Sequence, residues 1–134
     1  MKLVPLIVLA CAAAPAVAED VFFQSPSGNI HCIMSDDPNF GGTRCDIMEV
    51  NALSYASRPA DCDLDWGQAF FVGPSGGAGP ICHGDTAAAG GPVLDYGMSY
   101  TLGGVTCFSE TSGMLCRNEE GAGFALSRSE QQAF

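Results

Sequence analysis

Apolar residues recur at every second position in short runs along the chain, and glycine, proline, asparagine and aspartate separate these runs. In residues 29–34, Ile30 and Cys32 fall on one face of an extended segment. In residues 43–49, Cys45 falls on the apolar face in the same way. Helical periodicity is nearly absent. The pattern therefore predicts an all-β or β-rich domain.

Five further runs have the composition and alternation that are typical of strands. They cover residues 68–73, 79–83, 99–108, 113–118 and 123–127. Segments rich in glycine, alanine and proline lie between them, and we interpret these as turns and loops rather than as linkers between domains. We therefore expect a single small domain over residues 19–134.

The last residues of the chain predict one short helix. Ser127 and Glu130 stand three positions apart, which fits a capping box. In that motif the serine hydroxyl and the glutamate side chain satisfy free backbone amides at a helix start. We therefore expect a short C-terminal helix that continues through Gln132.

The first 18 residues are organised like a secretory signal peptide. Lys2 supplies a positive charge, residues 3–14 are apolar, and residues 16–18 read Ala-Val-Ala before a cleavage site that precedes Glu19. The apolar run is shorter than a bilayer-spanning helix. We therefore expect signal removal, no transmembrane segment afterwards, and a secreted or periplasmic location.

Lipid attachment is the alternative fate of the leader. Val8-Leu9-Ala10-Cys11 weakly resembles the motif in which a bacterial lipoprotein carries its lipid on the cysteine. The residues that follow Cys11 are apolar rather than polar, which favours the ordinary signal peptide.

The charge of the chain argues against two classes of partner. The formal net charge is −10, with fifteen acidic residues against five basic ones. Loss of Lys2 with the leader removes the only lysine and makes the charge more negative. Phosphate-rich partners need cationic counter-charge, so we expect no nucleic acid and no anionic lipid surface. An extracytoplasmic protein or a small ligand stays open as a partner.

Six cysteines remain after the leader, and an even number in a short exported chain predicts a disulfide framework. They are Cys32, Cys45, Cys62, Cys82, Cys107 and Cys116. Among the possible connectivities we favour pairs of neighbours along the chain. Each such bridge would add about 2–4 kcal/mol, mainly by restricting the unfolded chain.

Several motifs in one order are similar to domain of unknown function 6636, a family of uncharacterised small secreted bacterial proteins. The resemblance rests on residues 23–32, 44–46, 65–67, 82–86, 93–97 and 123–128, together with Cys107, Gly113 and Cys116. Such proteins carry Gly-His-Gly-Phe near the end, whereas this chain has Gly-Ala-Gly-Phe at 121–124, so no role for that histidine carries over. The resemblance implies export, disulfides and a common fold, and it implies no activity.

The candidates for catalysis are His31 and His83, the only two histidines. A small extracytoplasmic hydrolase would need one of them beside a serine such as Ser25 or Ser27 and a carboxylate such as Asp85. The sequence around the serines, Ser-Pro-Ser-Gly-Asn, is fully explained as a turn. We therefore assign no catalytic residue and keep His31, His83 and Asp85 as site candidates.

A calcium-stabilised structural protein is the third hypothesis. Asp61, Asp63 and Asp65 alternate like the start of an EF-hand loop. The EF-hand template then needs glycine at the position of Trp66 and glutamate at the position of Val72, so that template fails. We expect no cofactor, and the aspartates are weak calcium candidates. The leading hypothesis is a non-catalytic binding or structural module.

Overall fold

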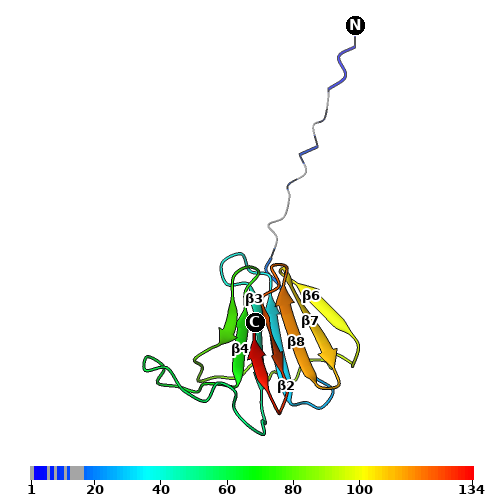
Figure 1. Cartoon of the computed structure of the whole chain (residues 1–134). Coiled ribbons are helices and arrows are strands. Elements are labelled where there is room, and N and C mark those ends of the chain that lie inside the picture. Colours follow the sequence, from blue (N-terminus) through cyan, green and yellow to red (C-terminus); the bar gives the residue numbers. More distant parts are fainter. Residues whose placement is uncertain (1, 6, 8, 11, 13–16) are drawn as a thin grey trace.

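The structure is a computed structural model that describes residues 2–5, 7, 9–10, 12 and 17–134. The described leader residues extend away from a β domain (Figure 1). Their apolar side chains are exposed to water: Leu3 is 98% and Val17 is 90% exposed. Within the described residues there is no helix, and hence none that could cross a membrane. The all-β prediction is confirmed.

In the described residues, ten strands form two five-stranded antiparallel sheets, and each sheet follows chain order. The first sheet contains β1 (Asp20–Gln24), β2 (Ile30–Ser35), β3 (Gly42–Ile47), β4 (Ala69–Val72) and β5 (Ala78–Pro80). The second contains β6 (Ser99–Leu102), β7 (Val105–Glu110), β8 (Gly113–Asn118), β9 (Gly123–Leu126) and β10 (Gln131–Ala133). Most connections within the sheets are short, which favours this up-and-down order, whereas the long segment of residues 48–68 joins β3 to β4.

The two sheets pack face to face around one apolar core (Figure 1). The rings of Phe70 on β4 and Phe124 on β9 lie 6.0 Å apart, and both are fully buried. At the side of the sandwich, Phe23 of β1 lies 6.4 Å from Tyr100 of β6. The edge strands β1 and β6 are therefore neighbours across the sandwich.

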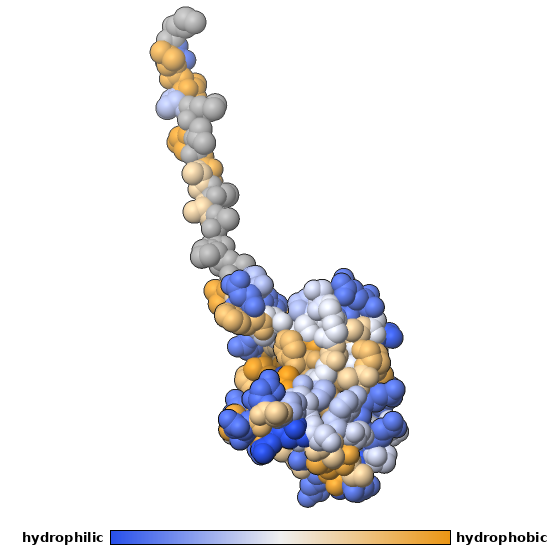
Figure 2. Space-filling model, turned by 60° about the vertical axis from the view of Figure 1, so that its left-hand side comes forward, coloured by the Kyte–Doolittle hydropathy of each residue, from blue (hydrophilic) through white to orange (hydrophobic). Residues whose placement is uncertain are grey.

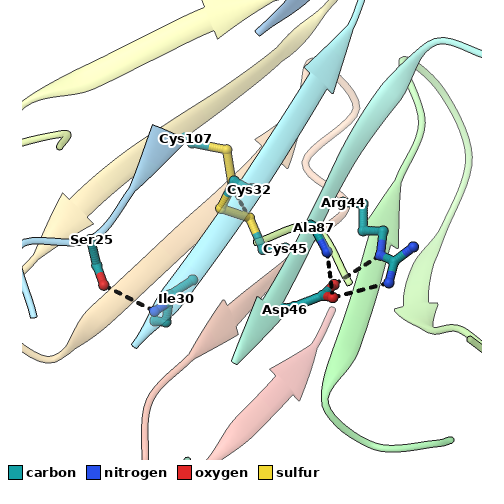
Figure 3. Close-up of a disulfide and its surroundings, with 9 residues drawn as sticks. Ser25, Ile30, Cys32, Arg44, Cys45, Asp46, Ala87 and Cys107 are labelled. Atoms are coloured by element: carbon teal, nitrogen blue, oxygen red, sulfur yellow. Dashed lines mark hydrogen bonds and ion pairs between the residues drawn. A yellow bond between two sulfur atoms is a disulfide. The ribbon is translucent and has the colours of Figure 1, made fainter. Parts of the chain in front are cut away.

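Among the described cysteines, three disulfides join neighbours along the chain, which confirms the predicted pairing. They are Cys32–Cys45, Cys62–Cys82 and Cys107–Cys116. The first joins paired residues of β2 and β3, and the third joins paired residues of β7 and β8. These two are fully buried, and Sγ of Cys45 lies 3.7 Å from Sγ of Cys116 (Figure 3).

The predicted strand over residues 99–108 is in fact two strands. Gly103 and Gly104 form the two-residue turn between β6 and β7, with φ angles of 58° and 80°. Two consecutive positive φ angles define the tight hairpin turn that suits glycine best. The run at 79–83 is also shorter than predicted, because β5 ends at Pro80.

The predicted C-terminal helix is wrong, because residues 131–133 form β10 and pair with β9. Ser127 Oγ does accept a hydrogen bond from the Glu130 amide, at 3.2 Å, as a helix cap would. The Ser127 amide, however, donates to the Glu130 carbonyl at 2.8 Å, which closes a hairpin turn. Gln131 is buried and exchanges two hydrogen bonds with Ser54. These tertiary contacts favour an extended conformation for residues 131–133 over a helix.

One long segment, Gly84–Leu94, crosses the outer face of the first sheet, and we call it the strap. The Ala87 amide donates to the Asp46 carboxylate of β3 at 2.9 Å. The Gln24 side chain of β1 donates to the Gly91 carbonyl at 2.7 Å. An isolated parallel β-bridge between Val93 and Gln24 then places the end of the strap beside β1, at the edge of the first sheet. The strap explains why the outward-facing Asp46 is only 2% exposed.

Candidate functional site

His83 lies in a cavity of about 340 Å³ at the margin of the first sheet. Backbone hydrogen bonds in both directions between Asp65 and His83 hold its position. Its Nδ1–H donates to the backbone carbonyl of Asp85 at 2.9 Å, and Nε2 is shielded from solvent without a partner in the described part of the chain. Main-chain atoms thus fix the orientation of the ring.

Two carboxylates that line this cavity, those of Asp46 and Asp85, are bound to Arg44. Figure 3 shows the pair of Arg44 with Asp46. Arg44 Nε and an Nη donate to both oxygens of Asp46, at 2.8 Å and 3.0 Å, and the other Nη donates to Asp85 at 2.9 Å. Burial alone would lower the pKa of Arg44, but the hydrogen bonds to Asp46 and Asp85 raise it overall. The Arg44 hydrogen bond, and then its charge, lower the pKa of Asp85. These groups fasten the strap to the sheet.

His31 is the other histidine candidate, and it closes a turn. Its Nε2–H donates to the Gly28 carbonyl at 2.9 Å, while Nδ1 is shielded and has no partner among the described residues. Asp46 is its register partner on β3, but the hydrogen bonds that this carboxylate accepts come from Arg44 and Ala87. The two histidines thus bond different turns, and neither has a hydrogen-bonded carboxylate or hydroxyl in the described chain.

The calcium candidates Asp61, Asp63 and Asp65 are all exposed. In the residues that the structure describes, the one group of three possible metal ligands within 4.8 Å of one another is Cys32, Cys45 and Cys116. Those sulfurs belong to disulfides. The geometry thus gives the calcium hypothesis no support.

A second cavity, of about 340 Å³, lies at one end of the sandwich, and we call it the polar cleft. Three hairpin turns meet there: the β1–β2 turn, the β7–β8 turn and the β9–β10 turn. Its polar lining consists of hydroxyl, amide and charged side chains and one tyrosine: Ser25, Ser27, Asn29, Asn51, Tyr96, Glu110, Thr111, Ser112, Ser127, Arg128 and Ser129. Both sheets therefore contribute polar groups to a single cavity.

Local hydrogen bonds make the back of the polar cleft rigid. Ser25 Oγ accepts from the Ile30 amide at 3.0 Å, which shapes the β1–β2 turn (Figure 3). The Asn29 side chain donates to the Glu49 carbonyl and accepts from the Glu49 amide, at 3.0 Å and 2.8 Å. Arg128 pairs with the Glu49 carboxylate at 3.1 Å. The cleft is thus built before any ligand arrives.

The front of the cleft is open to solvent, and Tyr96 is 49% exposed there. Glu110, Thr111 and Ser112 of the β7–β8 turn are exposed as well. These side chains present a ring face, a carboxylate and two hydroxyls on one side of the cavity. They can bind a polar molecule without rearrangement of the core.

Sequence patterns identified the serines of the β1–β2 turn but not the cleft. Ser25 and Ser27 were explained as turn formers, and they are, since Ser27 Oγ accepts from the Asn29 amide at 3.2 Å. Ser127 and Ser129 were assigned to a helix that does not exist. The signal for the cleft in the sequence was the presence of hydroxyl side chains in three separate turns. The order of strands in the two sheets is needed to show that these turns lie at the same end of the sandwich.

The chain belongs to the family of unknown function DUF6636, whose model matches residues 3–134. No curated protein and no solved structure shows significant similarity to it. The family resemblance is therefore confirmed over nearly the whole chain, and no relative supplies an activity or a ligand.

Proposed function

We propose that this protein is a non-catalytic, exported binding module whose polar cleft takes a small, polyhydroxylated ligand such as a neutral saccharide. The observation that carries the proposal is the convergence of hydroxyl and amide side chains from three turns on one preformed cavity. Saccharides offer hydroxyls at their edges and an apolar face, which match the polar lining and the exposed ring of Tyr96. The strongly negative chain disfavours anionic ligands.

The hydrogen bonds of the two histidines support a non-catalytic role for the protein. A general base needs a free nitrogen within reach of a hydroxyl and of an orienting carboxylate. His31 and His83 each direct one nitrogen to a backbone carbonyl, and the nearby Asp85 carboxylate is bound by Arg44. The other nitrogen of each ring is shielded and bonds no hydroxyl in the described chain, so neither histidine has the partners that a general base needs.

Disulfides and the leader support export. Three disulfides are typical of an oxidising, extracytoplasmic compartment. In Figure 2 the described leader residues are mostly hydrophobic and project away from the mixed surface of the domain. Apolar side chains that the fold leaves in water suit a segment that is removed. We infer that residues 1–18 are a signal peptide and that residues 19–134 act in the periplasm or outside the cell.

The proposal is tested by titrating the oxidised, isotope-labelled protein with glucose and N-acetylglucosamine disaccharides and following its amide signals. We expect shifts confined to the three turns of the cleft. Tyr96→Ala should weaken binding about tenfold, because stacking on an exposed ring contributes roughly 1–1.5 kcal/mol. Phe40→Ala, at an equally aromatic but remote exposed position, is the matched control and should bind normally.

Two results would contradict the proposal. One is a panel in which no saccharide shifts the cleft amides at millimolar concentration. The other is full affinity in Tyr96→Ala. Sugar release that depends on His31 or His83 would instead favour the hydrolase alternative.

A further inference from the structure

An apolar groove lies between the edge strands of the two sheets, away from the polar cleft. Its walls are Val21–Phe23 of β1, Pro92–Leu94 of the strap and Tyr100 of β6, and its volume is about 210 Å³. Phe22 and Val93 are 37% and 49% exposed. The fold thus leaves contiguous apolar surface in water, which is typical of an interaction site. We call this surface the β1/β6 groove.

The β6 strand has an unused backbone edge beside the groove, because among the described strands it pairs with β7 alone. The Ser109 amide donates to the Met98 carbonyl at 2.9 Å. This bond determines which residue pairs of β6 and β7 are hydrogen-bonded and which are not, because the two kinds alternate along antiparallel strands. Tyr100 is then a bonded residue, and Ser99 and Thr101 direct their N–H and C=O groups away from β7. Those groups are free to pair with an added strand.

A strand added to β6 would cover the groove. Tyr100 faces the sandwich interior, where its ring lies 6.4 Å from that of Phe23. Side chains of a neighbouring strand alternate between the two faces of the sheet. Every second residue of the added strand would therefore lie over the groove, against Phe22 and Val93. Apolar side chains are expected at those alternate positions of the added strand.

Carboxylates flank the groove at both ends. Asp20 precedes the β1 wall and is exposed, and Asp36 lies at the same end, beside the Gly103 turn. At the other end, exposed Asp95 follows the strap, and its carbonyl accepts from the Met98 amide at 3.0 Å. A partner with cationic ends is therefore favoured.

The arginines of the described domain are engaged elsewhere. Arg44 binds Asp46 and Asp85, Arg58 binds the Leu64 carbonyl, Arg117 lies over the Phe108 ring and Arg128 pairs with Glu49. None of these arginines lines the groove, so its nearest charged neighbours along the described chain are the flanking carboxylates.

We propose that the β1/β6 groove binds an extended segment of another protein, which adds to β6 as a further strand of the second sheet. The segment places apolar side chains at alternate positions in the groove and carries Lys or Arg at its two ends. Backbone pairing supplies affinity, and the groove and the flanking carboxylates supply specificity. The groove shares no lining residue with the polar cleft.

The probe is a fluorescein-labelled peptide, Arg-Val-Ser-Val-Ser-Val-Arg, added to the oxidised protein. We expect a rise in fluorescence anisotropy, weaker binding at high salt, and slower amide exchange at Ser99 and Thr101. A peptide with Glu in place of both Arg residues should bind at least tenfold more weakly.

Two substitutions at one position separate strand pairing from side-chain effects. Thr101→Pro removes an outward amide from an edge strand, where proline is tolerated, and should weaken the peptide about tenfold. Thr101→Val keeps that amide and loses the same hydroxyl, so it should bind like the parent protein. The double variant Asp20→Asn with Asp95→Asn leaves the backbone unchanged and should reduce the preference for the basic peptide severalfold.

Three results would overturn the proposal. The first is equal binding of basic and acidic peptides, and the second is full affinity in Thr101→Pro. The third is concentration-dependent self-association that Thr101→Pro abolishes, which would assign the β6 edge to a second copy of this chain.

Discussion

At the scale of single residues, the most constrained polar group is the Asp46 carboxylate. It is 2% exposed and accepts two hydrogen bonds from Arg44 and one from the Ala87 amide. A buried carboxylate is tolerated only when such partners replace water. Asp46 therefore joins strand β3 to the strap through one side chain, although it lies on the outer face of its sheet.

Replacing Asp46 by asparagine should cost about 2–3 kcal/mol of unfolding free energy, because the buried pair with Arg44 loses its charge. Urea denaturation followed by the single tryptophan measures this loss. Asp63→Asn, at an exposed aspartate, is the control and should change stability by less than about 0.5 kcal/mol. Equal effects of the two substitutions would contradict the role assigned to Asp46.

At the scale of elements, the strap should respond to pH through Asp85. The hydrogen bond and charge of Arg44 lower the pKa of Asp85 in the folded protein. A lowered folded pKa means that the stabilisation is present above the ordinary aspartate pKa, about 3.9, and is lost as pH falls through the lowered value. The strap contact should therefore weaken only in acid.

The measurement compares the parent protein with Asp85→Asn by denaturation at several pH values. The stability difference between them should be constant above about pH 5 and should shrink as the pH falls below about 4. Trp66, which lines the same cavity as Asp85, offers a local fluorescence signal. A difference that does not change with pH would show that the Asp85 carboxylate contributes nothing.

The elements show how far the sequence could predict this fold. Strands such as β2 and β3 were predictable, because alternating burial leaves a period of two in the sequence and places Cys32 and Cys45 on the inner face. The C-terminal helix was predicted wrongly, since Ser127 and Glu130 make the same first hydrogen bond in a helix cap and in the β9–β10 turn.

Long-range contacts were beyond the reach of sequence patterns. Arg44 and Asp85 are 41 positions apart, and either has many possible partners in so acidic a chain. The polar cleft is also formed by residues far apart in the sequence, because Ser27, Ser112 and Ser129 come from three separate turns. Each turn is locally predictable, whereas their meeting at one end depends on the order of strands in two sheets.

At the scale of the whole molecule, the two sheets are built alike. Each is a meander of five strands with a disulfide between its second and third strands, and these two disulfides meet in the core. Cys45 and Cys116 face one another from opposite sheets, with their sulfurs in contact. The disulfides thus help to fill the space between the sheets as well as to cross-link strands.

This contact predicts a specific disulfide exchange when one cysteine is removed. In Cys32→Ser, the Cys45 thiolate lies beside the Cys107–Cys116 disulfide, since its sulfur is 3.7 Å from that of Cys116 in the parent protein. Attack forms the Cys45–Cys116 bond, breaks the Cys107–Cys116 bond and leaves Cys107 as the thiolate, which takes up a proton. The number of disulfides is unchanged, but one of them now joins the two sheets.

Alkylation of the purified variant without reduction, followed by peptide mapping, identifies the free thiol. We expect label on Cys107 and a cross-linked peptide pair that contains Cys45 and Cys116. Cys45→Ser is the matched control, because it frees Cys32 instead and removes the sulfur that contacts Cys116; it should retain Cys107–Cys116. Label confined to Cys45 in Cys32→Ser would mean that the sheets hold the two sulfurs too rigidly to exchange, and that the two halves of the core act as separate cross-links.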